Sequence, residues 1–163
     1  MNVSRATLPA PAESAKSSTY GLNLVTAQEL RDLESALQKG HIPTDFESKL
    51  NRLAGQTLLH QSVEHNCRLF IALLEAVNEG LFSINGGQKE RLLRVLAYVR
   101  KDDDAVPDYK PNGFADDQRE VRAATIELAI LLDSFKSWRL LKQVPGLWNS
   151  ATHGTSKFTV SGR

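Results

Sequence analysis

The chain has 163 residues, of which 41% are hydrophobic and 24% are charged, and its formal net charge is +1. This length predicts one domain that buries a substantial core, and the composition is that of an ordinary globular protein. A net charge so close to zero gives no global field that would attract nucleic acid or an anionic membrane surface.

Three further features bear on the compartment. Cys67 is the single cysteine, so the chain forms no internal disulfide, and its place in an apolar helical run predicts a buried structural thiol. The longest nearly uncharged stretch, 123–132, is about half as long as a bilayer requires. The N-terminus has no apolar segment of the kind found in secretory signals. We therefore expect a cytoplasmic protein without a membrane span.

Composition divides the chain into three parts. Residues 1–18 are rich in Ala, Ser and Pro and are expected to form a disordered tail, and residues 149–163 a flexible one. Residues 19–148 carry helical periodicity and little strand signal. The predicted fold is therefore all-α, a single compact bundle of four to five helices with disordered termini.

Capping signals mark the first two helices. Thr26 and Glu29 have the spacing of a capping box, and Gly40 is suited to end the helix that follows. Thr44 and Glu47 repeat that spacing and predict the start of a second helix. Apolar residues at helical intervals define the buried faces of these two helices: Leu30, Leu33, Leu37, Phe46, Leu50 and Leu53.

Three longer helices follow. Residues 56–79 are apolar on almost every side near their middle, which predicts the central helix of the bundle. A fourth helix is expected from Gln88. A fifth is expected to begin at Asp116 or Asp117 and to continue without interruption to about Val144.

The segment between the fourth and fifth helices concentrates charge. Residues 101–117 hold six aspartates and two lysines, a net charge of −4. Pro107 and Pro111 stiffen the path of the backbone, and Gly113 adopts shapes that other residues resist. These features predict an ordered loop of fixed shape.

Three interpretations of this loop compete. In the first it is architectural, and Asp116 or Asp117 caps the fifth helix, whose positive dipole end favours a carboxylate. In the second it binds a divalent cation, with Asp104, Asp108, Asp116 and Asp117 as ligands, although no EF-hand spacing is present. In the third it is an acidic recognition surface for a basic protein. The candidate contact residues are then Asp104, Asp108, Tyr109, Asp116 and Asp117.

The loop also resembles the signature of a known family, the YkvA-like domain. The resemblance is carried by Asp104-x-Val106-Pro107-Asp108-Tyr109-x-Pro111, then Gly113 and Asp116-Asp117. It covers residues 88–132 and implies a helical domain. Lys110 makes this version of the motif more polar, which argues against membrane association. The family has no established activity, so the resemblance informs the fold and leaves the function open.

The end of the fifth helix combines aromatic and basic residues: Lys136, Trp138, Arg139, Lys142 and, beyond it, Trp148. Such a pattern could bind an anionic surface. It is also typical of aromatic core residues beside cations that the dipole favours at a helix C-terminus. We expect the second arrangement in this chain.

The sequence favours a non-enzymatic protein-interaction or scaffold module that presents the acidic loop. Its partner is expected to be another protein and not nucleic acid, and no cofactor is expected. The alternative is a divalent-metal-binding protein or metal-dependent enzyme that uses the aspartates. A secreted bacterial effector or accessory protein is a third option, prompted only by the composition of the N-terminus.

Overall fold

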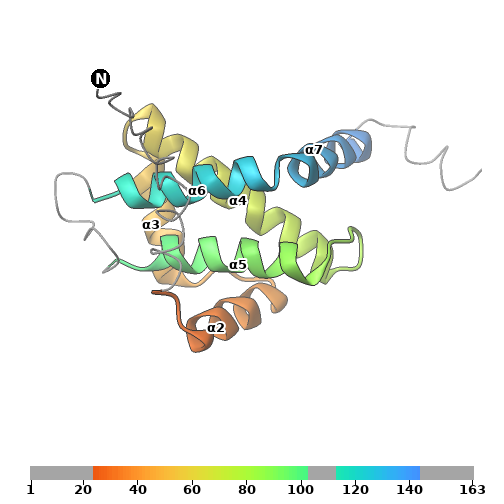
Figure 1. Ribbon diagram of the computed structural model, residues 1–163, viewed down its shortest axis with the longest axis horizontal. Coiled ribbons are helices and arrows are strands. Elements are labelled where there is room, and N and C mark those ends of the chain that lie inside the picture. Colours follow the sequence, from red (N-terminus) through yellow and green to blue (C-terminus); the bar gives the residue numbers. More distant parts are fainter. Residues whose placement is uncertain (1–23, 103–112, 144–163) are drawn as a thin grey trace, which may run out of the picture.

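The computed structural model describes residues 24–102 and 113–143 (Figure 1). Within these ranges it contains six α-helices and no strand, which confirms the all-α class and exceeds the predicted number of helices. The helices are α2 (Ala27–Gln38), α3 (Thr44–Ala54), α4 (Leu58–Asn78), α5 (Gly86–Arg100), α6 (Ala115–Glu127) and α7 (Ala129–Gln143). The tails predicted for residues 1–18 and 149–163 lie outside the described residues.

The extra helix arises because the predicted fifth helix is divided. Helix α6 ends at Glu127 and α7 begins at Ala129, while Leu128 between them has φ −102° and ψ 18°. The expectation of one uninterrupted helix was therefore wrong. The irregular residue changes the direction of the chain, and the new direction places Leu132 and Phe135 of α7 in the core. Apolar periodicity continues through such a bend, so the sequence pattern did not reveal it.

One of the two predicted capping boxes is present. The backbone N–H of Glu29 donates to the Thr26 hydroxyl at 3.2 Å, and the Thr26 N–H donates to the Glu29 carboxylate at 2.7 Å. The box predicted at Thr44 was wrong, because α3 begins at Thr44 itself and Pro43 occupies the N-cap position. Threonine inside the helix no longer has the extended backbone that a capping side chain requires.

A capping box that the sequence analysis missed opens α5. The Gln88 N–H donates to the Asn85 side chain at 2.8 Å, and the Asn85 N–H donates to the Gln88 side chain at 3.0 Å. The helix therefore starts at Gly86, two residues before the predicted start. The Asn-x-x-Gln spacing was the available signal, since Asn is a strong N-cap residue.

Helix α4 is the central element, as predicted, and contacts α2, α3, α5 and α6. In Figure 1 it runs diagonally across the bundle, and the other helices lie around it. Cys67 of α4 is fully buried, and burial raises the pKa of its thiol, as expected for a structural cysteine. Within residues 24–102 and 113–143, no helix combines the length and apolar character needed to cross a bilayer.

Helix α7 is attached to the core by aromatic residues. Phe82, in the connection between α4 and α5, meets Phe135 edge-on with 5.2 Å between ring centroids. Trp138 stacks on Phe135 at 5.5 Å and is half-buried. The Lys142 ammonium lies 4.3 Å from the centroid of the Trp138 ring. The expected arrangement of aromatic packing beside helix-terminal cations is confirmed for Trp138, while Trp148 lies outside the described residues.

The cap of α5 leads to a first prediction. Asn85→Ala should lower the free energy of unfolding by about 0.5–2 kcal/mol, because it removes the side-chain oxygen that accepts from the backbone N–H of Gln88. Thr57→Ala is the matched control, since Thr57 is the N-cap of α4 but makes no side-chain capping bond. Urea denaturation of both variants measures the difference. Equal losses would contradict the role of Asn85 as the cap of α5.

Candidate functional site

Three carboxylates are buried near the start of α6. Asp116, Asp117 and Glu120 are exposed by 2%, 0% and 0% of their surface. Their positions place them on the face of α6 that also carries the buried Val121 and Ala124. Acidic side chains are seldom fully buried without a partner. This cluster therefore marks the part of the fold where charge most needs a physical explanation.

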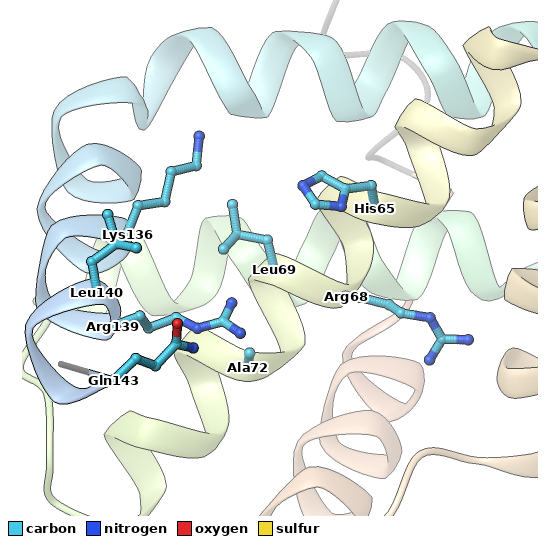
Figure 2. Close-up of a pocket in the computed structure, with 8 residues that line it drawn as sticks. All are labelled: His65, Arg68, Leu69, Ala72, Lys136, Arg139, Leu140 and Gln143. Carbon is cyan, nitrogen blue, oxygen red and sulfur yellow. The ribbon is translucent and has the colours of Figure 1, made fainter. Parts of the chain in front are cut away.

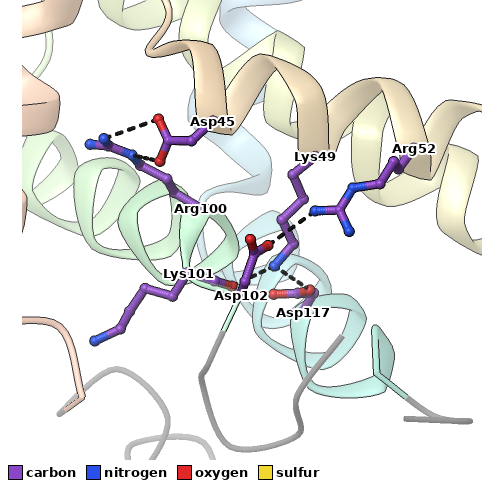
Figure 3. A network of polar contacts seen from close by, with 7 residues as sticks. All are labelled: Asp45, Lys49, Arg52, Arg100, Lys101, Asp102 and Asp117. Carbon is purple, nitrogen blue, oxygen red and sulfur yellow. Dashed lines mark hydrogen bonds and ion pairs between the residues drawn. The ribbon is translucent and has the colours of Figure 1, made fainter. Parts of the chain in front are cut away.

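Lys49 of α3 supplies much of the explanation (Figure 3). The side chain is fully buried, and its Nζ lies 3.2 Å from Oδ2 of Asp117. The same ammonium donates to the backbone carbonyl of Lys101 at 2.6 Å. It also lies 5.9 Å from the centroid of the Phe114 ring. One ammonium thus joins α3 to the end of α5 and to the start of α6.

The partners of Lys49 stand where helix electrostatics favours them. Lys101 is the C-cap of α5, and its carbonyl is among those that a helix end leaves without an intrahelical donor. Asp117 lies in the first turn of α6, where the helix dipole favours a negative charge. The ammonium therefore satisfies the negative end of one helix and the carboxylate at the positive end of the next.

Asp116 is held by a second buried contact. The Tyr98 hydroxyl of α5 donates to Oδ2 of Asp116 at 2.8 Å, and both side chains are buried. Neither aspartate is the N-cap of α6, because Phe114 occupies that position and the helix begins at Ala115. The predicted capping role was therefore wrong. The two carboxylates point into the core, onto Tyr98 and Lys49, and contribute little to any exposed acidic surface.

Glu120, like Lys49 and Tyr98, is a site residue that was not predicted from the sequence. Neither of its carboxylate oxygens accepts a hydrogen bond among the described residues, although Nε of Arg119 lies 3.5 Å from Oε1. Burial raises the pKa of Glu120; Arg119 and Arg91 oppose this effect, and Asp116 adds to it. Its position four residues after Asp116 and three after Asp117 was the available signal, since that spacing shares a helix face.

Exposed ion pairs surround the C-terminus of α5. Arg100 donates to Asp45 at 2.8 and 3.1 Å, and this bond is the main reason why the pKa of Asp45 is lowered. Arg52 donates to Asp102 at 3.0 Å, with both side chains at least half exposed. Figure 3 shows both pairs beside the buried Lys49. Exposed pairs contribute little individually, so the buried contacts dominate the local energetics.

The structure describes only one of the remaining predicted site residues. Gly113 is buried at the turn before α6. Asp104, Pro107, Asp108, Tyr109 and Pro111 lie outside the described residues, so their convergence with the Asp pair stays a prediction. Among residues 24–102 and 113–143, no group of three or more His, Cys, Asp or Glu side chains is placed to hold a metal ion.

Comparison of the chain with protein-family models, with curated proteins and with solved structures returned no match. The similarity of residues 104–117 to the YkvA-like signature therefore stays a prediction. Of that signature the structure describes Gly113, Asp116 and Asp117, and all three are buried at the junction of α5 and α6. The contacts of Asp116 with Tyr98 and of Asp117 with Lys49 give a physical reason for the two aspartates of that signature.

The buried ion pair leads to a second prediction. Lys49→Met should lower the free energy of unfolding by about 3–5 kcal/mol, because it leaves the Asp117 carboxylate buried without its ammonium. In Arg94→Met, which removes an exposed i,i+4 pair with Glu90, we expect a loss of only about 0.3–0.5 kcal/mol. Chemical denaturation of both variants provides the comparison.

A double-mutant cycle measures the interaction energy between Lys49 and Asp117 apart from the contacts that each makes with other residues. Lys49→Met combined with Asp117→Leu should cost less than the sum of the two single substitutions, because no uncompensated charge remains. Strict additivity of the two losses would show that the two side chains are not energetically coupled, and would refute the pairing of Lys49 with Asp117.

Glu120 leads to a third prediction, on pH dependence. Because its folded-state pKa is raised above the ordinary value of 4.5, the folded state binds the proton more tightly than the unfolded chain does. This contribution to stability is fully present below pH 4.5 and is lost as the pH rises through the folded-state pKa. Glu120→Gln has no such loss. Its stability relative to the unsubstituted protein should therefore increase between pH 4 and pH 7, and a constant difference in urea midpoints would contradict the prediction.

Proposed function

We propose that this chain is a non-enzymatic protein-interaction or scaffold module that presents the acidic segment 103–112 to a basic partner protein. The observation that carries the proposal is the contact of Lys49 with both flanks of that segment, the Lys101 carbonyl on one side and Asp117 on the other. Fixed flanks reduce the conformational entropy that a recognition segment loses on binding.

The charge available to a partner differs from the total charge of the motif. Residues 101–117 carry a net charge of −4, but Asp116 and Asp117 are turned into the core. Asp102 is paired with Arg52, so Asp103, Asp104 and Asp108 within the segment supply the negative charge that a basic surface would recognise. Complementary charge of this kind speeds encounter and selects partners.

Membership in the YkvA-like domain family is part of the proposal. It is supported by the spacing of the motif and by the burial of the glycine and the aspartate pair that close it. In this interpretation the chemistry of the motif is chiefly architectural. It holds the flanks of the segment, and the aspartates before Tyr109 are the residues that we propose a partner recognises.

The second candidate function is divalent-cation binding. The observation in its favour is the Glu120 carboxylate, which is buried near Asp116 and accepts no hydrogen bond among the described residues. Hard cations such as Ca²⁺ and Mg²⁺ take six or more oxygen ligands. A site beside Glu120 would need further carboxylates, for which Asp104 and Asp108 are the candidates.

A fourth prediction discriminates between these functions. Ca²⁺ or Mg²⁺ at millimolar concentration should leave the melting temperature unchanged. A ligand that binds only the folded state at a hundredfold excess over its Kd would stabilise it by about 2.7 kcal/mol, which differential scanning fluorimetry detects readily. A saturable increase that Asp108→Asn abolishes would replace the interaction module by the metal-binding alternative.

The interaction itself is tested by affinity capture with matched variants. The full chain with Asp103, Asp104 and Asp108 changed to Asn should lose a basic partner protein that the unsubstituted chain retains from an extract of its source cells. A control with Asp32, Asp133 and Glu79 changed to their amides has the same change in net charge at other exposed positions. Equal losses in both variants would show that net charge, and not this segment, determines the capture.

A further inference from the structure

A cavity of about 520 Å³ lies between α4 and α7 (Figure 2). Leu69 and Ala72 of α4 form its apolar side, and Leu140 of α7 faces them across the gap. The other five lining residues are polar: His65 and Arg68 of α4, and Lys136, Arg139 and Gln143 of α7. The cavity is thus an apolar surface bordered by polar side chains from two helices.

The border of this cavity is cationic. None of the eight lining residues is acidic, and Lys136 and Arg139 have no ion-pair partner among the described residues. In Figure 2 the guanidinium of Arg139 extends toward Leu69 and Ala72. Arg68 extends away from α7, and its charge is compensated by Glu47 and Glu64. The positive charge at the cavity therefore comes from Lys136 and Arg139 of α7.

The apolar part of the lining is incompletely covered by the residues that the structure describes. Leu140 is 64% exposed although it faces the apolar surface of α4. An apolar group that entered the gap would remove part of Leu140 from water, which is favourable in proportion to the area covered. A carboxylate on the same molecule would gain charge-assisted hydrogen bonds from Lys136 and Arg139.

The size of the cavity decides between a small molecule and a protein. Cavities of about 300–1,000 Å³ are typical of small-ligand sites, and 520 Å³ falls in this range. A stable protein interface covers about 800 Å² on each partner and about 20–30 residues a side. Eight lining residues on two helices make a site smaller than that, so the geometry favours a small ligand.

We propose that the α4–α7 cavity binds a small anionic amphiphile, a monomeric carboxylate with an aliphatic chain. The carboxylate pairs with Lys136 and Arg139, and the chain lies against Leu69, Ala72 and Leu140. This site goes beyond the proposed interaction of the acidic segment. In Figure 1, α7 lies at the end of the bundle opposite to the start of α6, where Asp117 meets Lys49.

The test is calorimetric titration of the full chain with dodecanoate below its micelle concentration, beside the uncharged dodecanamide. We expect saturable binding of dodecanoate at one site, and binding of the amide weaker by about tenfold because it forms no ion pair. Amide resonances of α4 and α7 should shift in two-dimensional NMR spectra. Equal affinities for the two compounds, or shifts confined to other helices, would overturn the proposal.

Matched variants locate the site. Lys136→Glu should weaken dodecanoate binding about tenfold and Leu140→Ser about threefold, since they remove the charge and the apolar contact, respectively. Lys39→Glu and Leu141→Ser make the same changes at an exposed lysine and an exposed leucine outside the cavity. They should leave the affinity for dodecanoate within about twofold of that of the unsubstituted protein. All four positions are exposed, so we expect the variants to fold, and thermal melts would test this. Equal effects of the cavity and control variants would refute the assignment.

A vesicle sedimentation experiment distinguishes binding of a dissolved carboxylate from binding to a membrane surface. Vesicles of phosphatidylglycerol and phosphatidylcholine offer anionic headgroups, while their chains stay within the bilayer. We expect no sedimentation of the protein with these vesicles at a lipid concentration equal to a saturating concentration of dodecanoate. Sedimentation that Lys136→Glu abolishes would replace the small-ligand site by a membrane-contact site.

Discussion

The buried contact between Lys49 and Asp117 is the constraint on which the arrangement of α3, α5 and α6 depends. Transfer of two ions out of water costs several kcal/mol each, and only close pairing with additional hydrogen bonds offsets that cost. In this pair the separation is 3.2 Å, and the ammonium also donates to Lys101 at 2.6 Å. The three helices must therefore pack so that the Lys49 ammonium reaches both Asp117 and the Lys101 carbonyl. Any other packing leaves a buried charge uncompensated.

Such a pair contributes more to the choice of one packing than to total stability. Asp116 and Asp117 are adjacent in the sequence, so their side chains leave α6 about 100° apart. Tyr98 of α5 receives one and Lys49 of α3 receives the other. Rotation of α6 by one residue would move one aspartate to the place of the other and bring Ala115 or Gln118 to a position that needs a carboxylate. The two contacts together fix the rotation of α6 against its neighbours, which apolar packing alone specifies weakly.

The parts of this fold that were predictable from sequence are those encoded locally. The Thr26 box, the apolar character of α4 and the burial of Cys67 depend on residues within a few turns of one another, and all were predicted correctly. The break at Leu128 was missed because it depends on where Phe135 must pack, on Phe82 some fifty residues earlier. Periodicity records which face is apolar but not the direction in which the next helix runs.

The site was predictable in part. The aspartate pair was singled out, but its role as an N-cap was wrong, because the partners of both carboxylates come from other helices. The sequence does place Lys49 on the apolar face of its helix, since it follows Phe46 by three residues and precedes Leu53 by four. A lysine on an apolar helix face either extends its ammonium to water or has a buried partner. The sequence does not distinguish these two outcomes until the partner on α6 is placed.

The near-zero net charge conceals two local fields of opposite sign. Aspartates follow the C-terminus of α5, while Lys136 and Arg139 border the cavity on α7 at the other end of the bundle (Figure 1). At physiological ionic strength exposed charges are largely screened beyond about 8 Å, so the two ends act independently on what approaches them. Total charge is therefore a poor guide to the partners of this protein. The informative quantity is the charge that remains at each end after the buried pairs have been neutralised.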